Sequence, residues 1–272
     1  MSDSLFTPLD DGRFLPTGFS RGPWSPDALH GGPVAVLVAR EAERVLAGTG
    51  RPAHVPVRLT LDLERPVPLA PLTVTTTVVR PGKKIQVAEV VVADEAGTRL
   101  ARGSVLAIRR EPIARPDDLV APSDEVPPAP TEAASGGPGW SFPDAPQAFH
   151  QDATEHRAVR GTLGEVGPVT DWIRLAVDVL PGEAPSPFQR VAAASDFLNG
   201  VSFVLSPLDW TFINPDLTVT LHRLPVGEQV AVEAVTRIDA DGTGTAEADL
   251  YDEVGRLGRA VQTLLVEPRP GA

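Results

Sequence analysis

The apolar positions of the chain fall into two similar series, and each series runs from a helix-like segment into four strand-like segments. In the first series, residues 33–46 carry apolar side chains on one face and charged side chains on the other, which predicts an amphipathic helix. Pro33 suits the first helical position, and Gly48 suits the end of the helix. Runs rich in Val, Leu and Thr then predict strands within 55–67, 71–82, 84–97 and 99–110.

The second series is similar, but its helix-like segment, residues 187–205, has apolar residues on nearly every side. A helix with that pattern is usually buried on all sides. Two strand-like runs precede it and four follow it, within 149–160, 170–179, 216–227, 228–242, 243–255 and 256–269. A long helix with an antiparallel set of strands is an α+β unit, so the pattern predicts two such units in one chain.

Matching residues indicate that the two series are copies of one unit. The segment LTLDLER at 59–65 matches LTVTLHR at 217–223 with an offset of 158 residues (217 − 59). The segment RLAR at 99–102 matches RLGR at 256–259 with an offset of 157 residues (256 − 99). Two copies of an α+β unit can join their sheets edge to edge, which protects the edge strands.

Residues 111–146 separate the copies and are rich in Pro, Ala, Gly and acidic residues. Because proline cannot donate to a strand ladder or continue a helix, we expect a linker, ordered in part by docking of Trp140 and Phe142. The predicted organisation is an N-terminal domain at 1–110, this linker, and a C-terminal domain at 147–272. The length of 272 residues fits two domains of about 110–130 residues each.

The composition narrows the class of protein. Hydrophobic residues make up 42% of the chain, which is enough for packed cores. The net charge of −12 and the lack of a basic stretch argue against nucleic-acid binding. The absence of cysteine excludes a cysteine nucleophile, thiolate metal ligands and disulfides. Without a signal-like N-terminus or a run of 18 apolar residues, we expect a cytoplasmic protein with no membrane partner.

Asp196 is the polar residue in the middle of the apolar segment 187–205. An ionised carboxylate is costly to bury unless it is paired or hydrogen-bonded. Asp196 therefore has a partner, opens into a cleft or serves a chemical function. The alternative is that Ser195 and Asp196 cap a second helical segment, since both residue types are good N-caps.

The duplication supplies an internal comparison for Asp196, Asn214 and Gln262. By offset, their counterparts in the first copy are Val38 or Ala39 for Asp196, Pro56 for Asn214 and Val105 for Gln262. A single polar residue at such a position could be a satisfied core residue. Three polar residues in one copy, with no polar counterpart in the other, favour a functional site in the second copy.

The tripeptide His30-Gly31-Gly32 is the candidate contribution of the first copy. Glycine lets the backbone approach a ligand closely, and the following helix start offers N–H groups at the positive end of a dipole. Such a place suits a developing oxyanion. A tight turn into the helix would explain the same residues.

Four segments together resemble a known family. They are HGGPVAVLVAREAERV, AAASDFLNG, LDWTFINPDLTVTLHR and GTAEADLYDEVGRLGRAVQTLL, and they span most of both copies. With the duplication, they resemble the double-hotdog acyl-CoA thioesterases, which are the type II, TesB-like enzymes and their actinobacterial thioesterase-like relatives. The resemblance implies a duplicated hotdog, in which each antiparallel sheet wraps a long central helix.

The family's site consists of an Asp on the second helix, a Thr at the start of the following strand and a Gln on the last strand. Asp196 and Gln262 match these positions directly, and Asn214 stands where the family has Thr. The resemblance implies hydrolysis of an acyl-CoA thioester to free acid and CoA. Asp196 would activate a water that Gln262 and Asn214 hold.

The resemblance also indicates residues on the substrate side of the site. We expect His30, Gly31 and Gly32 to contact the substrate, with Asp216 and Thr218 close by. The expected partner is an acyl-CoA, and the chemistry needs neither a metal nor a redox cofactor. A homodimer is the expected assembly, because the outer sheet faces of fused hotdogs often pair again.

Two other functions fit the sequence. An acyl-CoA-binding hotdog with a decayed site is favoured by Asn214 in the Thr position. A hotdog hydratase or dehydratase acting on enoyl or hydroxyacyl thioesters would need a paired Asp and His, for which His222 is the only candidate in the sequence.

Overall fold

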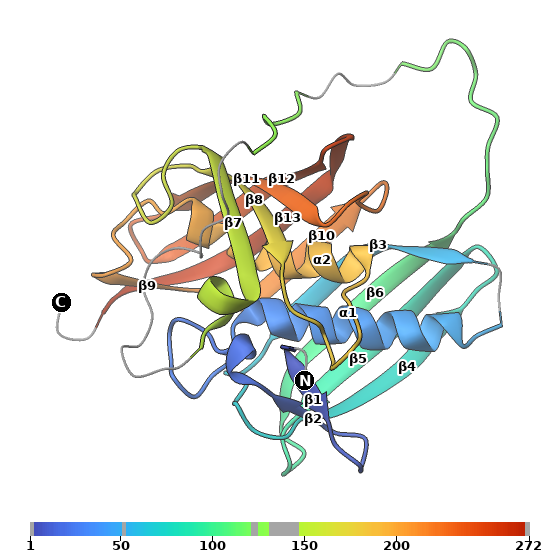
Figure 1. Cartoon of the computed structure of the whole chain (residues 1–272), viewed down its shortest axis with the longest axis horizontal. Helices are drawn as coiled ribbons and strands as arrows, with labels where there is room; N and C mark the ends of the chain where they lie inside the picture. The colour runs from blue at the N-terminus through green and yellow to red at the C-terminus, as the bar shows by residue number, and fades with distance from the viewer. Residues whose placement is uncertain (1–2, 51–52, 121–124, 131–146, 270–272) are drawn as a thin grey trace.

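A computed structural model describes residues 3–50, 53–120, 125–130 and 147–269. Its main feature is an antiparallel sheet of eleven strands in the order β4-β5-β6-β3-β10-β13-β12-β11-β8-β7, with β9 paired to β13 (Figure 1). The strands are β3 (His54–Leu63), β4 (Thr73–Pro81), β5 (Ile85–Ala93), β6 (Arg99–Arg109), β7 (Thr154–Arg160), β8 (Thr170–Leu175), β9 (Trp210–Ile213), β10 (Asp216–Leu221), β11 (Gln229–Ile238), β12 (Thr243–Asp252) and β13 (Gly255–Pro268).

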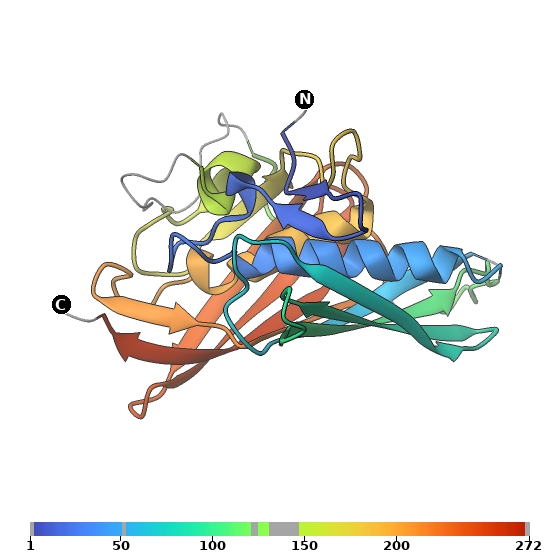
Figure 2. The same ribbon diagram turned by 90° about the horizontal axis from the view of Figure 1, so that it is seen from below.

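Two helices pack against each other on one face of this sheet (Figure 2). They are α1 (Gly31–Ala47) and α2 (Pro187–Ala194). A two-stranded sheet of β1 (Phe6–Pro8) and β2 (Phe14–Pro16) lies on the other side of α1, as Figure 2 shows. Because protein surrounds α1, every residue from Gly32 to Ala39 is buried.

The second helix is shorter than the sequence predicts. It begins at a capping box between Ser186 and Gln189 and ends at Ala194, and the chain continues as the 3₁₀ turns η3 (Ser195–Phe197) and η4 (Asn199–Val201). The prediction of a continuous helix to residue 205 is therefore wrong. Ser195 is the C-cap of α2 and does not cap a second α-helix.

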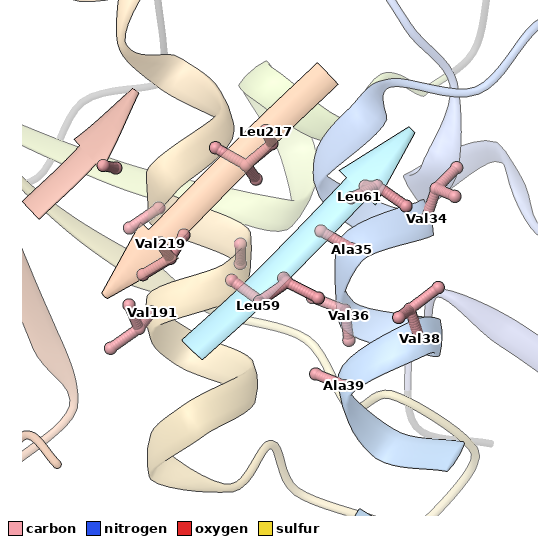
Figure 3. Close-up of a cluster of buried hydrophobic side chains, with 14 of the residues drawn as sticks. Val34, Ala35, Val36, Val38, Ala39, Leu59, Leu61, Val191, Leu217 and Val219 are labelled. Carbon is pink, nitrogen blue, oxygen red and sulfur yellow. The ribbon is translucent and has the colours of Figure 1, made fainter. Parts of the chain in front are cut away.

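The two halves of the sheet join where β3 pairs with β10. Thr60 lies opposite Thr218, its own counterpart at the offset of 158 residues, and Leu61 lies opposite Leu217. A residue that pairs with its own copy lies on a local two-fold axis. Below this joint, apolar side chains of both strands and both helices form one continuous core, and Figure 3 labels Val34, Ala35, Val36, Val38, Ala39, Leu59, Leu61, Val191, Leu217 and Val219.

The matching strands differ at one place. In the first half, β3 runs unbroken past a bulge between Pro56 and Arg58. In the second half, Asn214 and Pro215 interrupt the strand and divide it into β9 and β10. The sequence did not predict β9 or β1, and for residues 13–21, which contain β2, it left a strand and a loop both open.

The start of the second half also differs from the prediction. Residues 149–160 were expected to form one strand, but the first five form a π-helical turn, η2 (Phe149–Ala153), which stands ahead of β7. A 3₁₀ turn, η1 (Gly18–Ser20), lies beside η2. These turns bring residues of both halves toward the end of α2.

The described part of the linker contains no helix or strand. Trp172 of β8 donates a hydrogen bond from Nε1 to the carbonyl of Pro128, so residues 125–130 contact the sheet. The predicted docking of Trp140 and Phe142 falls outside the described residues. Within the described part of the chain, neither helix is both long and apolar enough to cross a membrane.

Candidate active site

Asp196 lies in η3, directly after α2, and only 8% of its surface is exposed. Its Oδ1 accepts hydrogen bonds from Nδ2 of Asn214 at 2.8 Å and from Nε2 of Gln262 at 2.9 Å. Asn214 comes from the break between β9 and β10, and Gln262 from the buried face of β13. The structure therefore brings together the three polar residues that distinguish the second copy from the first.

His30 adds a third donor from the other half of the chain. Its Nδ1 lies 2.6 Å from Oδ2 of Asp196, and both side chains are largely buried. A carboxylate offers about four acceptor positions. With two taken on Oδ1 and one on Oδ2, Asp196 keeps one acceptor position for a further donor such as water.

The Nδ1 atom of His30 has two neighbours that it cannot serve together. It lies 3.1 Å from the backbone N–H of Gly32, which would need a lone pair on Nδ1, and 2.6 Å from the Asp196 carboxylate, which needs a proton there. A charge-assisted bond to a carboxylate is the stronger of the two. We therefore assign the proton to Nδ1, with Asp196 as its acceptor.

Gly31 allows the close approach between Asp196 and the start of α1. A Cβ atom at position 31 would lie 2.7 Å from Oδ2 and 2.8 Å from Oδ1 of Asp196. The same crowding exists at Gly32, whose Cβ would lie 2.6 Å from the Phe149 ring. The glycine pair is therefore explained by contact with the second half and not only by a turn.

The Asp196 side chain faces a cavity of about 370 Å³ between the two halves. His30, Gly31, Asn214 and Gln262 line the cavity beside it. Buried apolar side chains form much of the remaining wall, among them Val34, Phe203, Phe212 and Leu264. The volume falls at the lower end of the range for small-molecule sites, and a few polar groups in an apolar wall are typical of such sites.

Asp216 and Thr218, which the sequence placed near the substrate, do not line this cavity. Side chains alternate along β10, and Leu217 and Val219 occupy the buried face beneath the helices. Asp216 therefore points to the outer face, where its carboxylate accepts bonds from the backbone and hydroxyl of Thr263. Gly32 is also not among the lining residues, although its neighbour Gly31 is.

Sequence reasoning missed the aromatic surroundings of His30. The ring centroids of Phe149 and Phe197 each lie 5.0 Å from that of His30, and the His150 ring stacks on it at 6.4 Å. His150 also lines the cavity and is 3% exposed. Because η2 was taken for a strand, nothing in the sequence pattern placed its residues near Asp196.

The corresponding positions of the first half form no polar cluster. Val38, Ala39 and Val105 are fully buried in the apolar core, and Pro56 has no polar side chain. Asp196, Asn214 and Gln262 thus have no polar counterparts in the first half.

Comparison with known families identifies the family to which the chain belongs. The sequence profile of the acyl-CoA thioesterase N-terminal domain matches residues 20–108, and that of the C-terminal domain matches residues 115–266. Together the matches cover most of the sequence, and the chain belongs to the acyl-CoA thioesterase family. No curated protein matches the sequence.

Solved structures with a similar fold extend over nearly the whole chain. A structure from Thermobifida fusca assigned to thioesterase II has a TM-score of 0.69 at 20% identity, over 96% of this chain and 95% of that one. A hot dog fold protein from Alicyclobacillus acidocaldarius has a TM-score of 0.68 at 17% identity, over 98% and 96%. The acyl-CoA thioesterase II TesB2 of Mycobacterium marinum has a TM-score of 0.64 at 15% identity, over 98% and 96%. At these identities the likeness establishes the hotdog type of fold.

Proposed function

We propose that this chain is a double-hotdog enzyme that hydrolyses acyl-CoA thioesters to free acid and CoA, with Asp196 as the group that activates water. One observation carries the proposal: Asp196 is held by three donors, keeps one acceptor position, and faces an apolar cavity. A buried carboxylate with a place for one water suits general-base catalysis. The family assignment supports the same chemistry.

In the proposed reaction, water bound to Asp196 attacks the thioester carbonyl carbon while its proton passes to the carboxylate. The first N–H groups of a helix have no acceptor within the helix, so the N–H of Gly31 is suited to stabilise the oxyanion. Collapse of the tetrahedral intermediate breaks the C–S bond. The proton taken up by Asp196 then passes to the departing thiolate, and the acid and the thiol are the products.

The other side chains have separate roles in this proposal. Asn214 and Gln262 hold Oδ1, and His30 holds Oδ2, so the carboxylate cannot rotate away from the water. The apolar wall around Phe203 and Phe212 provides room for the acyl group. The cavity extends past Trp24 and the exposed Arg65, where the CoA portion would emerge.

The test is an assay of free thiol released from short, medium, long and aromatic acyl-CoAs. We expect Asp196→Asn to lower kcat by a factor on the order of 10²–10⁴, the usual contribution of a general base. KM should change little, because the acyl chain and CoA bind to other groups. Asp216→Asn is the matched control, since that carboxylate lies on the outer face, and it should keep wild-type rates. Near-normal hydrolysis by Asp196→Asn would instead assign the carboxylate a structural role.

A second function is favoured by the pairing of His30 with Asp196. The sequence offered only His222 as the histidine of a hydratase dyad, but His222 is exposed and does not line the cavity. His30 contacts Asp196 directly, so the paired Asp and His that hydration of an enoyl thioester needs are both present. An α,β-enoyl-CoA substrate separates the two reactions, because hydration removes the C=C bond and leaves CoA attached, whereas hydrolysis releases the thiol.

A further inference from the structure

A buried polar chain lies behind the candidate active site and takes no part in the reaction proposed above. It consists of Thr154 and His156 on β7 and Asp171 on β8. His156 and Asp171 are fully buried, and Thr154 is 3% exposed. None of the three lines the cavity, so none can touch a substrate there.

The hydrogen bonds of this buried polar chain run from β8 to η2. Nδ1 of His156 lies 2.5 Å from Oδ2 of Asp171, and Nε2 lies 2.9 Å from the hydroxyl of Thr154. The same hydroxyl donates to the backbone carbonyl of Phe149 at 3.1 Å. Asp171 is fixed in turn, because its Oδ1 accepts from the backbone N–H of Arg157 at 2.8 Å. The position of Phe149 is thus tied to the sheet by a continuous polar chain.

Contacts between aromatic rings connect the buried polar chain to the candidate active site. The rings of His156 and Phe197 form a T-shaped contact, with a centroid distance of 4.8 Å and an interplanar angle of 76°. Phe197 directly follows Asp196 and stacks on Phe149 at 5.6 Å and 17°. Both phenyl rings contact the imidazole of His30. His30 is therefore held by the rings of Phe149 and Phe197. His156 contacts the Phe197 ring, and Thr154, the hydrogen-bond partner of His156, holds the backbone carbonyl of Phe149.

We propose that Thr154, His156 and Asp171 are positioning residues, which fix the His30 imidazole against Asp196 through Phe149 and Phe197. The proposal rests on the proposed function, since it assigns a role toward that same carboxylate. A buried His–Asp pair is costly to desolvate, and apolar residues of similar volume often replace such pairs without loss of stability. A requirement for exact placement explains its presence, because a misplacement of about 1 Å can cost on the order of 10²-fold in rate.

The test uses Thr154→Val, which removes the hydroxyl shared by His156 and Phe149 and keeps the shape of the side chain. We expect kcat for thioester hydrolysis to fall by a factor of about 10, within the range for misplacement, with KM little changed. Thr154→Ser keeps the hydroxyl and should restore most of kcat. Thr49→Val is the matched control, because it removes a hydroxyl bonded to the carbonyl of Leu46 at the far end of α1, and it should leave kcat unchanged.

A double-mutant cycle with His30→Gln separates positioning from a general effect on folding. If the polar chain acts through His30, Thr154→Val should lower kcat much less in the His30→Gln background than in the wild type. If Thr154→Val lowered kcat by the same factor in the His30→Gln background as in the wild type, the proposal would be overturned.

A direct readout is the NMR signal of the His30 Nδ1 proton, which a short bond to a carboxylate shifts downfield. We expect Thr154→Val to weaken or move this signal and Thr49→Val to leave it in place. An unchanged signal in Thr154→Val would contradict the proposal. Because the signal needs no substrate, it tests the positioning role even if the wild type released no thiol, a result that would count against the proposed function alone.

Discussion

At the scale of the residue, the contact between Gly31 and Asp196 gives a direct prediction. Gly31→Ala should lower kcat by about 10-fold or more, because the new Cβ would lie 2.7–2.8 Å from the carboxylate oxygens and must displace them. Gly48→Ala at the other end of α1 is the control. Its Cβ would meet nothing closer than 3.5 Å, and its φ of −70° suits alanine. Equal rates of thiol release from the two variants would contradict the prediction.

The residues of the site differ in how far the sequence reveals them. Asp196, Asn214 and Gln262 stand out because the other copy has apolar residues or proline at their positions. The partnership of His30 with Asp196 could not be predicted in the same way. The two residues lie 166 positions apart (196 − 30), and their contact depends on how α1 packs against the end of α2. His150 gave no signal because its segment resembled a strand.

At the scale of the element, the fold follows the sequence where periodicity is strong and departs from it where single residues decide. The meander strands β3 to β6 and β10 to β13 lie within or close to their predicted ranges. The segment 187–205 is apolar on nearly every side, so its pattern could not show where the α-helix stops. The predicted strand began at residue 216, directly after Asn214 and Pro215, so β9 ahead of this interruption was missed.

Asp252 at the end of β12 anchors the turn into β13. Burial alone would raise the pKa of Asp252, but hydrogen bonds from Arg223 and from the backbone N–H groups of Val226 and Val254 outweigh it and lower the pKa. The stabilisation from Asp252 is therefore complete at a pH above the pKa that Asp252 has in the unfolded chain. It is lost as the pH falls through the lower pKa that Asp252 has in the folded protein.

We expect Asp252→Asn to reduce the free energy of unfolding at pH 7 by about 1.5–3 kcal/mol, the range for hydrogen bonds to charged groups. Urea unfolding at pH 7 and at pH 3 measures the effect, which should shrink at the acid pH. The control is Glu89→Gln, which removes the exposed pair with Arg102 and should change stability by less than about 1 kcal/mol. If Asp252→Asn lost as much stability at pH 3 as at pH 7, the result would contradict this role of the carboxylate.

Glu43 on α1 should show the opposite pH dependence. Burial raises its pKa, although hydrogen bonds from Ser186 and Gln189 at the start of α2 oppose the rise. A folded state with a raised carboxyl pKa binds the proton more tightly than the unfolded state, so stability falls as the pH rises from the unfolded to the folded pKa. Glu43→Gln should remove this decline, which thermal melts between pH 4 and pH 7 would show. A decline of the same size in the variant would count against the role of Glu43.

At the scale of the whole molecule, the start of each helix lies close to a carboxylate at or just beyond the C-terminal part of the other helix. The start of α1 meets Asp196, and the start of α2 meets Glu43, which accepts bonds from Ser186 and Gln189. The second contact is closed, because Ser186 and Gln189 also form the capping box and Pro187 has no N–H to offer. Only the first contact opens onto the apolar cavity that Asp196 faces.

This asymmetry predicts one substrate site for each chain. A thioether analogue of an acyl-CoA, which cannot be hydrolysed, should bind with a stoichiometry of one per chain in isothermal titration calorimetry. Phe212→Trp, which adds bulk to the cavity wall, should weaken that single event, while Val105→Ile in the first half should leave it unchanged. A stoichiometry of two would show that the first half also binds substrate.

The pairing of β3 with β10 has a consequence for how the chain is made. The ribosome completes α1 and the strands β3 to β6 when it reaches Arg109, but the partner of β3 begins only at Asp216. At about 5–20 residues per second, the 107 further residues up to Asp216 (216 − 109) take roughly 5–20 s to synthesise. During that interval the nascent first half has an unpaired strand edge at β3 and an uncovered flank of α1, both of which favour aggregation. We therefore expect this architecture to need protection of the nascent first half, by the ribosome surface or by a chaperone, until β10 has been made.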